Sequence, residues 1–440
     1  MSLVDTVKQA GVIGCGGAGF PTHVKIDTKA DVVIANGAEC EPLLNSDQRV
    51  MEHYADELIE GLCLIMKQVG ASRGIIGLKK AYHGSIDALS QRIEGLDGVE
   101  IGVLGNFYPS GDEQILLTEL TGRIVPEGGI PPQVNAVVFN VLTMVQVARA
   151  AKGQNVTHRE VTLVGEVKKP KVVTTAIGTP VRDLLNLAMP TIPIEDIVVI
   201  DGGPMMGKIV PLDATINKTT SGLIFLSKDH PLIQWWSIPM PAMVRRSAAA
   251  CCQCRDCTEA CSRYMQGHNI QPHLMMRSLA YQNNEPTSGM TAAFLCSQCG
   301  LCEFACPMNL SPRRAYAELA AKFRADGMKN PHHNAPASVH EFNQYRKIGK
   351  DRLIRRYQLT DYDSHALTLT PIPDPPLVRL SLTQAFGAPC EPVVKSGDVV
   401  EAGQLIANAP EGKLGAALHA SIGGMVTGID SDYITIEGSK

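Results

Sequence analysis

The sequence predicts a multidomain α/β protein with a helical, cysteine-rich region in its second half and a compact β unit at its end. Three observations support this prediction. Short apolar segments alternate with amphipathic segments over the first 150 residues, which is typical of a mostly parallel sheet covered by helices. Nine of the 13 cysteines fall between residues 251 and 306. From residue 376 onward, short β-rich stretches are separated by Gly-Asp and Gly-Gly turns.

The first domain is predicted over residues 1–150. Leu3–Ala10 is expected to form a helix, and the apolar run Asp31–Ala35 is expected to form a buried strand. Val50–Val69 carries apolar residues at helical spacing, which predicts one long helix. Two further strands are expected, at Gly74–Leu78 and Glu100–Leu104.

Several shorter regions follow the first domain. Residues 155–232 are rich in β-branched residues and hold one amphipathic segment, as expected of a small α+β module. Its strands are predicted at Val161–Val164 and Ile197–Ile200, and its helix near Val181–Ala188. The rest is predicted to be a linker at Trp235–Pro241, a helical domain over 242–325, a basic linker over 326–372 and a compact β domain over 373–440.

The bulk composition narrows the function classes. A formal net charge of -4 argues against a general nucleic-acid binder. No apolar run reaches the roughly 18 to 20 residues that a membrane-spanning helix needs, and Met1–Asp5 lacks the basic and apolar regions of a signal peptide. We therefore expect a cytoplasmic protein without a membrane span, in which clustered cysteines are metal ligands rather than disulfides.

The clustered cysteines form two complete runs. The first is Cys251-x2-Cys254-x2-Cys257-x3-Cys261, and the second is Cys296-x2-Cys299-x2-Cys302-x3-Cys306 followed by Pro307. Both runs have the spacing of bacterial ferredoxins, which bind four-iron, four-sulfur clusters through such cysteines. The sequence therefore predicts two 4Fe-4S clusters.

The fourth cysteine of each run is expected to ligate the other cluster, because it lies one helical turn beyond the triplet and faces away from it. The two predicted ligand sets are Cys251, Cys254, Cys257 and Cys306 for one cluster, and Cys296, Cys299, Cys302 and Cys261 for the other. The alternative is structural zinc, which usually needs only four ligands in two pairs. Two departures from the ferredoxin pattern are the extra cysteine Cys252 and Ser262, which replaces a proline.

A glycine-rich loop lies near the N-terminus, Gly14-Cys15-Gly16-Gly17-Ala18-Gly19. It formally matches the dinucleotide-binding pattern GxGxxG, but that loop follows a strand and opens a helix. Here a predicted helix precedes the glycines, and Pro21 disfavours a helical Phe20. We expect instead a different phosphate-cradling loop, in which backbone N–H groups approach an anion and Lys25 supplies positive charge.

Five motifs carry a resemblance to a known family. They are GVIGCGGAGFPTHVK (Gly11–Lys25), NGAECEP (Asn36–Pro42), YPSGDEQ (Tyr108–Gln114), FNVLT (Phe139–Thr143) and DGGPMMG (Asp201–Gly207). These segments resemble the FMN- and NADH-binding fold of complex I and, more closely, the C subunit of the Rnf electron-transport complex and its soluble relatives. The resemblance covers nearly the whole chain, including the paired cysteine runs.

The resemblance implies a site for FMN and NADH in the first domain. The residues that would hold FMN are Gly14, Gly16, Gly17, Gly19, Lys25, Asn36, Tyr108, Gly111, Asp112, Asn140 and Thr143. Those that would face the nicotinamide dinucleotide are Phe20, Glu41 and Glu113. Leu142 stands where complex I relatives have a glutamate, so one FMN contact would differ. The alternative is an α/β domain whose glycines only form turns.

The C-terminal β domain resembles a biotinyl/lipoyl-type sandwich, a barrel-sandwich hybrid, through Val393–Ala407 and His419–Asp430. By the same resemblance, the α+β module over 155–232 is expected to be SLBB-like. In Rnf C subunits the sandwich usually precedes the FMN domain, whereas here it comes last. That order resembles the soluble cobalamin reductases of propanediol-utilisation microcompartments.

The resemblance implies electron transfer, with no side-chain acid or base needed for the hydride step. The expected path runs from NADH to FMN, to the first cluster, to the second cluster and on to an acceptor. The favoured acceptor is a corrinoid, reduced to reactivate a B12-dependent enzyme in a bacterial microcompartment, with shell or enzyme proteins as further partners. The alternatives are a donor to another redox protein such as proline reductase, a peripheral Rnf-type subunit, and a non-enzymatic scaffold.

Overall fold

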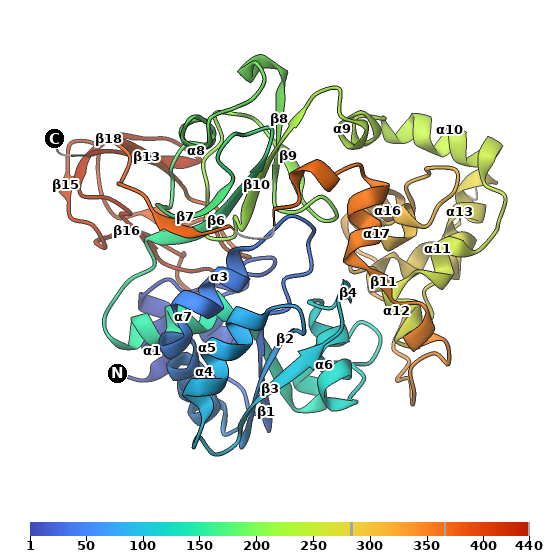
Figure 1. The fold of residues 1–440 in the computed structure, drawn as a ribbon, viewed down its shortest axis with the longest axis horizontal. Helices are drawn as coiled ribbons and strands as arrows, with labels where there is room; N and C mark the ends of the chain where they lie inside the picture. The colour runs from blue at the N-terminus through green and yellow to red at the C-terminus, as the bar shows by residue number, and fades with distance from the viewer. Residues whose placement is uncertain (282–284, 365–366, 439–440) are drawn as a thin grey trace.

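The computed structural model describes residues 1–281, 285–364 and 367–438. Four bodies are arranged around a common centre (Figure 1). The N-terminal α/β domain lies at the bottom of the view, the second domain at the top, the C-terminal β domain at the left, and the helical cysteine-rich region at the right. The predicted multidomain α/β architecture is confirmed.

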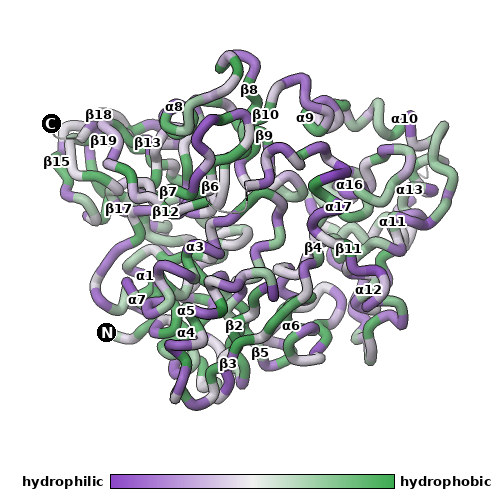
Figure 2. The backbone as a smooth tube through the Cα atoms, viewed as in Figure 1, coloured by the Kyte–Doolittle hydropathy of each residue, from purple (hydrophilic) through white to green (hydrophobic). Residues whose placement is uncertain are grey.

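The first domain is built on a four-stranded sheet in the order β3-β2-β1-β5, and every pair in it is parallel. Its strands are β1 (Val32–Asn36), β2 (Arg73–Lys79), β3 (Val99–Leu104) and β5 (Ala136–Asn140). β1 and β5 are largely apolar and buried, as expected of strands covered on both faces, and the apolar stretches are visible in Figure 2. The order of the strands reverses between β1 and β5, and ligands bind outside the carboxyl ends of strands at such a point.

Helices cover both faces of this sheet. They are α1 (Leu3–Gln9), α2 (Thr22–Lys25), α3 (Ser46–His53), α4 (Ala55–Val69), α5 (His83–Ile93), α6 (Glu113–Thr121) and α7 (Val141–Ala151). The predicted single helix over Val50–Val69 is wrong, because the chain bends at Tyr54 (φ -120°, ψ 31°) and forms α3 and α4 instead. Both helices face the same apolar core, so the helical spacing of their apolar residues continues across the bend.

The second domain contains a six-stranded sheet in the order β12-β7-β6-β10-β8-β9. Its elements are β6 (His158–Gly165), β7 (Lys171–Ala176), α8 (Val181–Ala188), β8 (Ile197–Asp201), β9 (Lys208–Val210), β10 (Gly222–Ser227) and β12 (Leu369–Pro371). The predicted strands and helix of this module are confirmed. The edge strand β12 comes from the region expected to be a basic linker, and it pairs in parallel with β7.

The cysteine-rich region is helical. Its helices are α9 (Pro231–Trp236), α10 (Met240–Ala250), α11 (Asp256–Glu259), α12 (Ser262–Met265), α13 (Pro272–Ala280), α14 (Ser288–Thr291), α15 (Leu301–Phe304) and α16 (Pro312–Ala325). The linker predicted at Trp235–Pro241 is mostly helical, because Pro231 and Pro241 begin helices rather than interrupt them. The chain then returns to the first domain, where β11 (Ile348–Gly349) pairs with β4 (Phe107–Tyr108) and is followed by α17 (Lys350–Arg356).

The C-terminal domain consists of two small antiparallel sheets. One contains β13 (Leu377–Ser381), β19 (Tyr433–Gly438), β18 (Gly424–Ile429) and β15 (Val399–Val400), and the other β14 (Glu391–Pro392), β16 (Leu405–Asn408) and β17 (Leu418–His419). The buried side chains of this domain belong to the same apolar core as those of the first domain. Among the described residues, no helix has the length and apolarity that crossing a bilayer requires.

Candidate functional site

The glycine-rich loop is closed at its base and open at its tip. Gly14 donates its N–H to the carbonyl of Phe20 at 2.9 Å, and Cys15 donates its N–H to Thr143 Oγ1 at 2.9 Å. The buried guanidinium of Arg159, from the second domain, donates to the carbonyl of Cys15 at 2.9 Å. The tip is exposed, and a Cβ atom built on Gly17 would meet nothing within 4 Å. The loop therefore faces open space from a fixed base.

The loop lies at the carboxyl ends of β1 and β5, where the strand order reverses. Asn36 and Asn140 end these two strands and are paired in register. The Asn36 amide donates to the carbonyl of Gly111 at 2.8 Å, and the Asn140 amide donates to Asp47 at 2.7 Å. A Cβ atom on Gly16 would lie 3.0 Å from Asn140 Nδ2, so the loop touches the end of β5. Residues far apart in sequence thus converge at this edge.

The predicted dinucleotide-facing residues do not share one surface. Phe20 and Glu113 lie at the open side, where Glu113 pairs with Lys25 at 3.5 Å. Glu41 instead lies inside the molecule, where its carboxylate accepts hydrogen bonds from Tyr108 Oη at 3.2 Å and from the N–H of Met205 at 2.9 Å. Burial raises the pKa of Glu41 to about 7.

The glycines of the DGGPMMG motif make room for Glu41. A Cβ atom on Gly203 would lie 2.0 Å from a carboxylate oxygen of Glu41, so any larger residue there would displace that side chain. The motif therefore joins the second domain to the first, which explains why Asp201–Gly207 accompanies the glycine-rich loop.

A buried ammonium near the edge escaped the sequence analysis. Lys79 ends β2 and is 1% exposed, and among the described residues no hydrogen-bond partner reaches its Nζ. Burial lowers the pKa of Lys79 to about 8. The open loop, the asparagine amides and this unpaired ammonium fit an anionic heteroaromatic ligand such as FMN. The Lys-Lys pair at 79 and 80 follows a strand, which was the only signal in the sequence.

Two pockets in the helical region are lined by cysteines. We name the first the outer pocket; it is lined by Cys251, Cys254, Cys257 and Cys306, and also by Cys252, Arg255, His273 and Met308. We name the second the inner pocket; it is lined by Cys261, Cys296, Cys299 and Cys302, and also by Arg263, Arg313 and Tyr316. Each pocket holds three cysteines of one run and the fourth of the other. This donor set suits an iron–sulfur cluster, and the ligand assignment itself remains a proposal.

The two cysteine loops have the same local geometry. The third residue of each run is a glutamine with positive φ, 56° at Gln253 and 61° at Gln298, and its amide donates to the first sulfur of the run. The residue after the second cysteine also has positive φ, 71° at Arg255 and 81° at Gly300. Repeated left-handed residues wrap each loop tightly and aim its sulfurs inward.

The inner pocket is joined directly to the first domain. Tyr108 donates its hydroxyl to the carbonyl of Cys299 at 2.7 Å. Arg263 donates twice to the Asp112 carboxylate, at 2.6 and 2.9 Å, and both side chains are largely buried. The Asp112 carboxylate also caps α6, which leaves its backbone for the predicted FMN contact.

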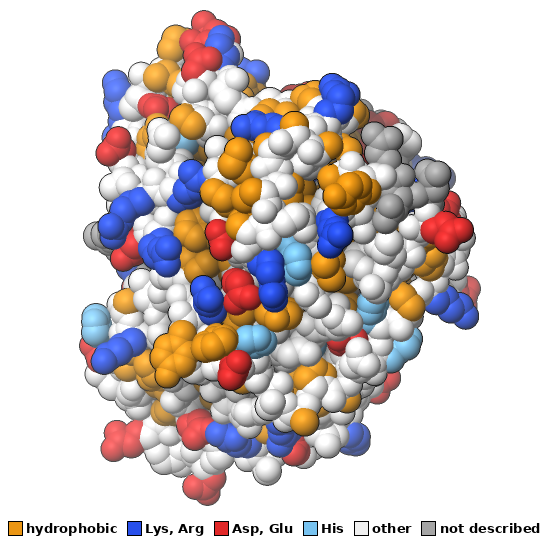
Figure 3. All heavy atoms as spheres, turned by 90° about the vertical axis from the view of Figure 1, so that its right-hand side faces the viewer, with side chains coloured by type: hydrophobic (Ala, Val, Ile, Leu, Met, Phe, Trp, Pro, Cys, Tyr) orange, Lys and Arg blue, Asp and Glu red, His pale blue; other side chains and the backbone are white. Residues whose placement is uncertain are grey.

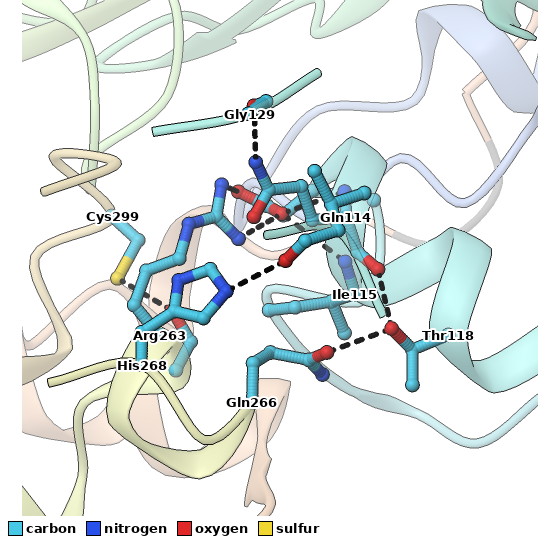
Figure 4. A network of polar contacts seen from close by, with 12 residues as sticks. Gln114, Ile115, Thr118, Gly129, Arg263, Gln266, His268 and Cys299 are labelled. Atoms are coloured by element: carbon cyan, nitrogen blue, oxygen red, sulfur yellow. Dashed lines mark hydrogen bonds and ion pairs between the residues drawn. The ribbon is translucent and has the colours of Figure 1, made fainter. Parts of the chain in front are cut away.

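Further contacts of the residues after Cys261 strengthen this joint. Gln266 accepts from Thr118 at 2.7 Å, and His268 contacts the carbonyl of Val125 at 2.9 Å. Figure 4 shows Arg263, Gln266 and His268 pointing toward α6. A small apolar cluster completes it, formed by Tyr108, Met205, Cys299, Leu301, Ile348 and Leu353.

The order of clusters expected from the sequence, with the first run before the second, is not the order in which the fold arranges the pockets. The pocket of the second triplet adjoins the first domain through Tyr108 and Asp112. The pocket of the first triplet is packed among α10, α11, α13 and α16, and its Cys252 and Cys254 are exposed. Chain order does not set spatial order here, because the two runs fold as a pseudo-symmetric pair.

Family models match four stretches of the chain. A Nuo51 FMN-binding domain matches residues 7–149, and an SLBB domain matches 161–208. A 4Fe-4S dicluster domain matches 250–311, and an RnfC barrel sandwich hybrid domain matches 360–439. The fold class and the family expected from the motifs are thereby confirmed, and the chain is an oxidoreductase of the flavin and iron–sulfur class.

Two full-length relatives and one solved structure place the chain more closely. Cobalamin reductase PduS of Salmonella typhimurium is 38% identical over 98% of this chain and 95% of the relative, and PduS of Citrobacter freundii is 39% identical over 99% and 96%. An NAD⁺-reducing NiFe hydrogenase structure has a TM-score of 0.50 at 21% identity, covers 75% of this chain and 67% of its own, and supports the fold alone.

A more distant relative shares part of the chain. The RnfC-like component of the proton-translocating ferredoxin:NAD⁺ oxidoreductase complex of Clostridium ljungdahlii is 34% identical over 60% of this chain and 56% of the relative. The near-complete coverage by the first two relatives decides the assignment. The chain belongs to the family of the cobalamin reductases PduS.

Proposed function

We propose that this protein transfers electrons from NADH, through FMN and two 4Fe-4S clusters, to a corrinoid. The observation that carries the proposal is the direct joint between the glycine-loop edge and the inner pocket, made by Tyr108 and Asp112. The two full-length relatives, both called cobalamin reductases, support the choice of acceptor. Cytoplasmic location, a microcompartment and its shell or enzyme partners remain predictions.

The chain's own residues position the cofactors. The backbone of Gly14–Gly19 and Lys25 would hold the FMN phosphate, while Asn36 and Asn140 present their amides at the carboxyl edge. Bound FMN supplies the exchange between hydride and single electrons. Tyr108 and Arg263 hold the inner pocket against this edge, so we propose that electrons enter the inner pocket first and leave through the outer pocket.

The outer pocket suits delivery to a partner because it opens near the surface. Cys252 and Cys254 are exposed, and Met308 at its rim is 40% exposed. Figure 3 looks onto the side of the molecule that carries the helical region, where apolar and basic side chains gather. The exposed arginines Arg245 and Arg246 of α10 are consistent with that picture. A docked acceptor would thus approach the outer cluster without crossing the protein.

The test is an anaerobic titration of reconstituted protein with NADH, followed by addition of a cobalamin. We expect about eight irons per chain, bleaching of the flavin by NADH, and NADH-dependent cobalamin reduction. Stoichiometric zinc without acid-labile sulfide would contradict the clusters. Cobalamin reduction that survives loss of both clusters would show that the flavin reduces it directly.

The glycine loop is tested by Gly17→Val. Because a Cβ atom at this position meets nothing, the variant should fold, and its side chain should occupy the space proposed for the flavin phosphate. The matched control is Gly428→Val in β18, where a Cβ atom likewise has no neighbour closer than 4.0 Å. FMN should be lost from the first variant and kept by the second. Full flavin content in both would place the site elsewhere.

A further inference from the structure

A segment of the C-terminal domain lies against the glycine-rich loop, although the two are at opposite ends of the chain. Phe386 donates its N–H to the carbonyl of Gly19 at 3.0 Å. The ring centroids of Phe20 and Phe386 are 6.0 Å apart, with 34° between the ring planes. A Cβ atom on Gly19 would lie 3.3 Å from the carbonyl oxygen of Gln384. The rim of the loop is therefore shared by two domains.

A buried joint of three domains fixes this placement. Lys218 of the second domain is 2% exposed, and its ammonium donates to the carbonyls of Gly11 and Ala417, each at 2.7 Å. The backbone N–H of Lys218 donates to Gln384 Oε1 at 2.9 Å. A buried ammonium requires such acceptors, so moving the C-terminal domain away would leave it unpaired. The segment carrying Phe386 is thus held in position rather than tethered.

The two phenylalanines are unusual in their exposure. Phe20 is 37% exposed and Phe386 is 55% exposed. Single exposed apolar residues need no explanation, but these two are contributed by different domains and meet beside the open tip of the loop. Aromatic rings stack favourably at centroid distances of about 4.5 to 7 Å, and nucleic-acid bases stack on exposed aromatic side chains in the same way. The pair therefore offers a stacking surface for a planar base.

We propose that Phe386 is a positioning residue for the dinucleotide, stacking with Phe20 against its adenine. The inference rests on the proposed function, since it concerns the donor NADH. The nicotinamide must reach the flavin at the carboxyl edge of the sheet, near Asn36 and Asn140, so the exposed rim is left for the other end of the molecule. The C-terminal domain thereby contributes to the donor site.

The test compares Phe386→Ala with wild type by stopped-flow bleaching of the bound flavin under anaerobic conditions. The NADH concentration for half-maximal rate should rise about tenfold, within the range measured for base stacking, while the limiting rate stays unchanged. FMN content should also stay unchanged. Phe386→Tyr, which keeps the ring, should restore the affinity.

Two controls separate stacking from a structural effect. Reduced nicotinamide mononucleotide lacks adenine, so Phe386→Ala should bleach with it as wild type does. Phe342→Ala removes another exposed ring, 46% exposed, on the helical side of the molecule and should change nothing. Equal NADH affinity in wild type and Phe386→Ala would overturn the inference and leave the proposed function standing. A changed limiting rate, or an equal loss with the mononucleotide, would also overturn it. Wild type that NADH does not bleach would contradict the proposed function itself.

Discussion

The inner and outer pockets are made by the same cysteine spacing, yet their surroundings differ. Cys261, Cys299 and Cys302 of the inner pocket are each at most 8% exposed, whereas Cys254 of the outer pocket is exposed. The inner pocket is bound to the first domain by a hydroxyl and a buried ion pair, and the outer pocket lies among the region's own helices. A local motif can thus build two similar loops while packing gives them different neighbours, and hence different roles.

The largest expected effect comes from removing one cluster at a time. In Cys302→Ala, NADH should bleach the flavin but leave the outer cluster oxidised, because the inner cluster is its electron source. In Cys257→Ala, the inner cluster should be reduced normally, while cobalamin reduction falls by at least about a hundredfold, equivalent to about 2.7 kcal/mol of barrier. Electron paramagnetic resonance after NADH addition distinguishes the two. Rapid reduction of the outer cluster in Cys302→Ala would restore the order expected from the sequence.

A second effect concerns the ion pairs beside the pockets. Arg263→Ala leaves the largely buried Asp112 carboxylate without its partner and should lower the free energy of unfolding by about 3 to 5 kcal/mol. Arg346, whose side chain is 50% exposed, pairs with Glu259 near the outer pocket. Arg346→Ala should cost at most about 1 kcal/mol. Anaerobic urea unfolding measures both, and equal losses would show that the joint is no stronger than a surface contact.

A third effect is a pH dependence at the joint. The pKa of Glu41 is raised to about 7 from 4.5, so between these values the folded protein binds more protons than the unfolded chain. The contribution of Glu41 to stability is therefore present below about pH 4.5 and lost as pH rises through 7. Relative to Glu41→Gln, wild type should lose about 3 kcal/mol of unfolding free energy between pH 5 and pH 8. Parallel curves for the two proteins would mean that Glu41 is ionised in the fold throughout.

The smallest effect is expected at Cys252. This side chain is exposed beside the outer pocket, and the pocket already has four cysteines from the two runs. Cys252→Ser should change the free energy of unfolding by less than about 0.5 kcal/mol and leave iron content unaltered. Loss of iron from this variant alone would identify Cys252 as a ligand of the outer cluster.

Most elements of the first two domains could be predicted from hydrophobic pattern alone, because β1, β2 and α8 bury the apolar faces that their sequences display. The pattern failed at Tyr54, since both flanking helices contact one core, and at Pro231 and Pro241, since a proline suits the first turn of a helix as well as a linker. Strand β12 was also missed, because its pairing with β7 depends on where the chain returns after residue 325.

The sequence by itself determined the chemistry of each local segment. Cysteine spacing sets which sulfurs can face a common centre, and glycines near residue 17 leave space that no side chain occupies, because such short segments are governed by local backbone geometry. Only the tertiary structure decided which pocket adjoins the first domain, that Lys79 is buried without a partner among the described residues, and that Phe386 meets Phe20. These facts depend on contacts between segments far apart in the chain, and packing of whole domains sets those contacts.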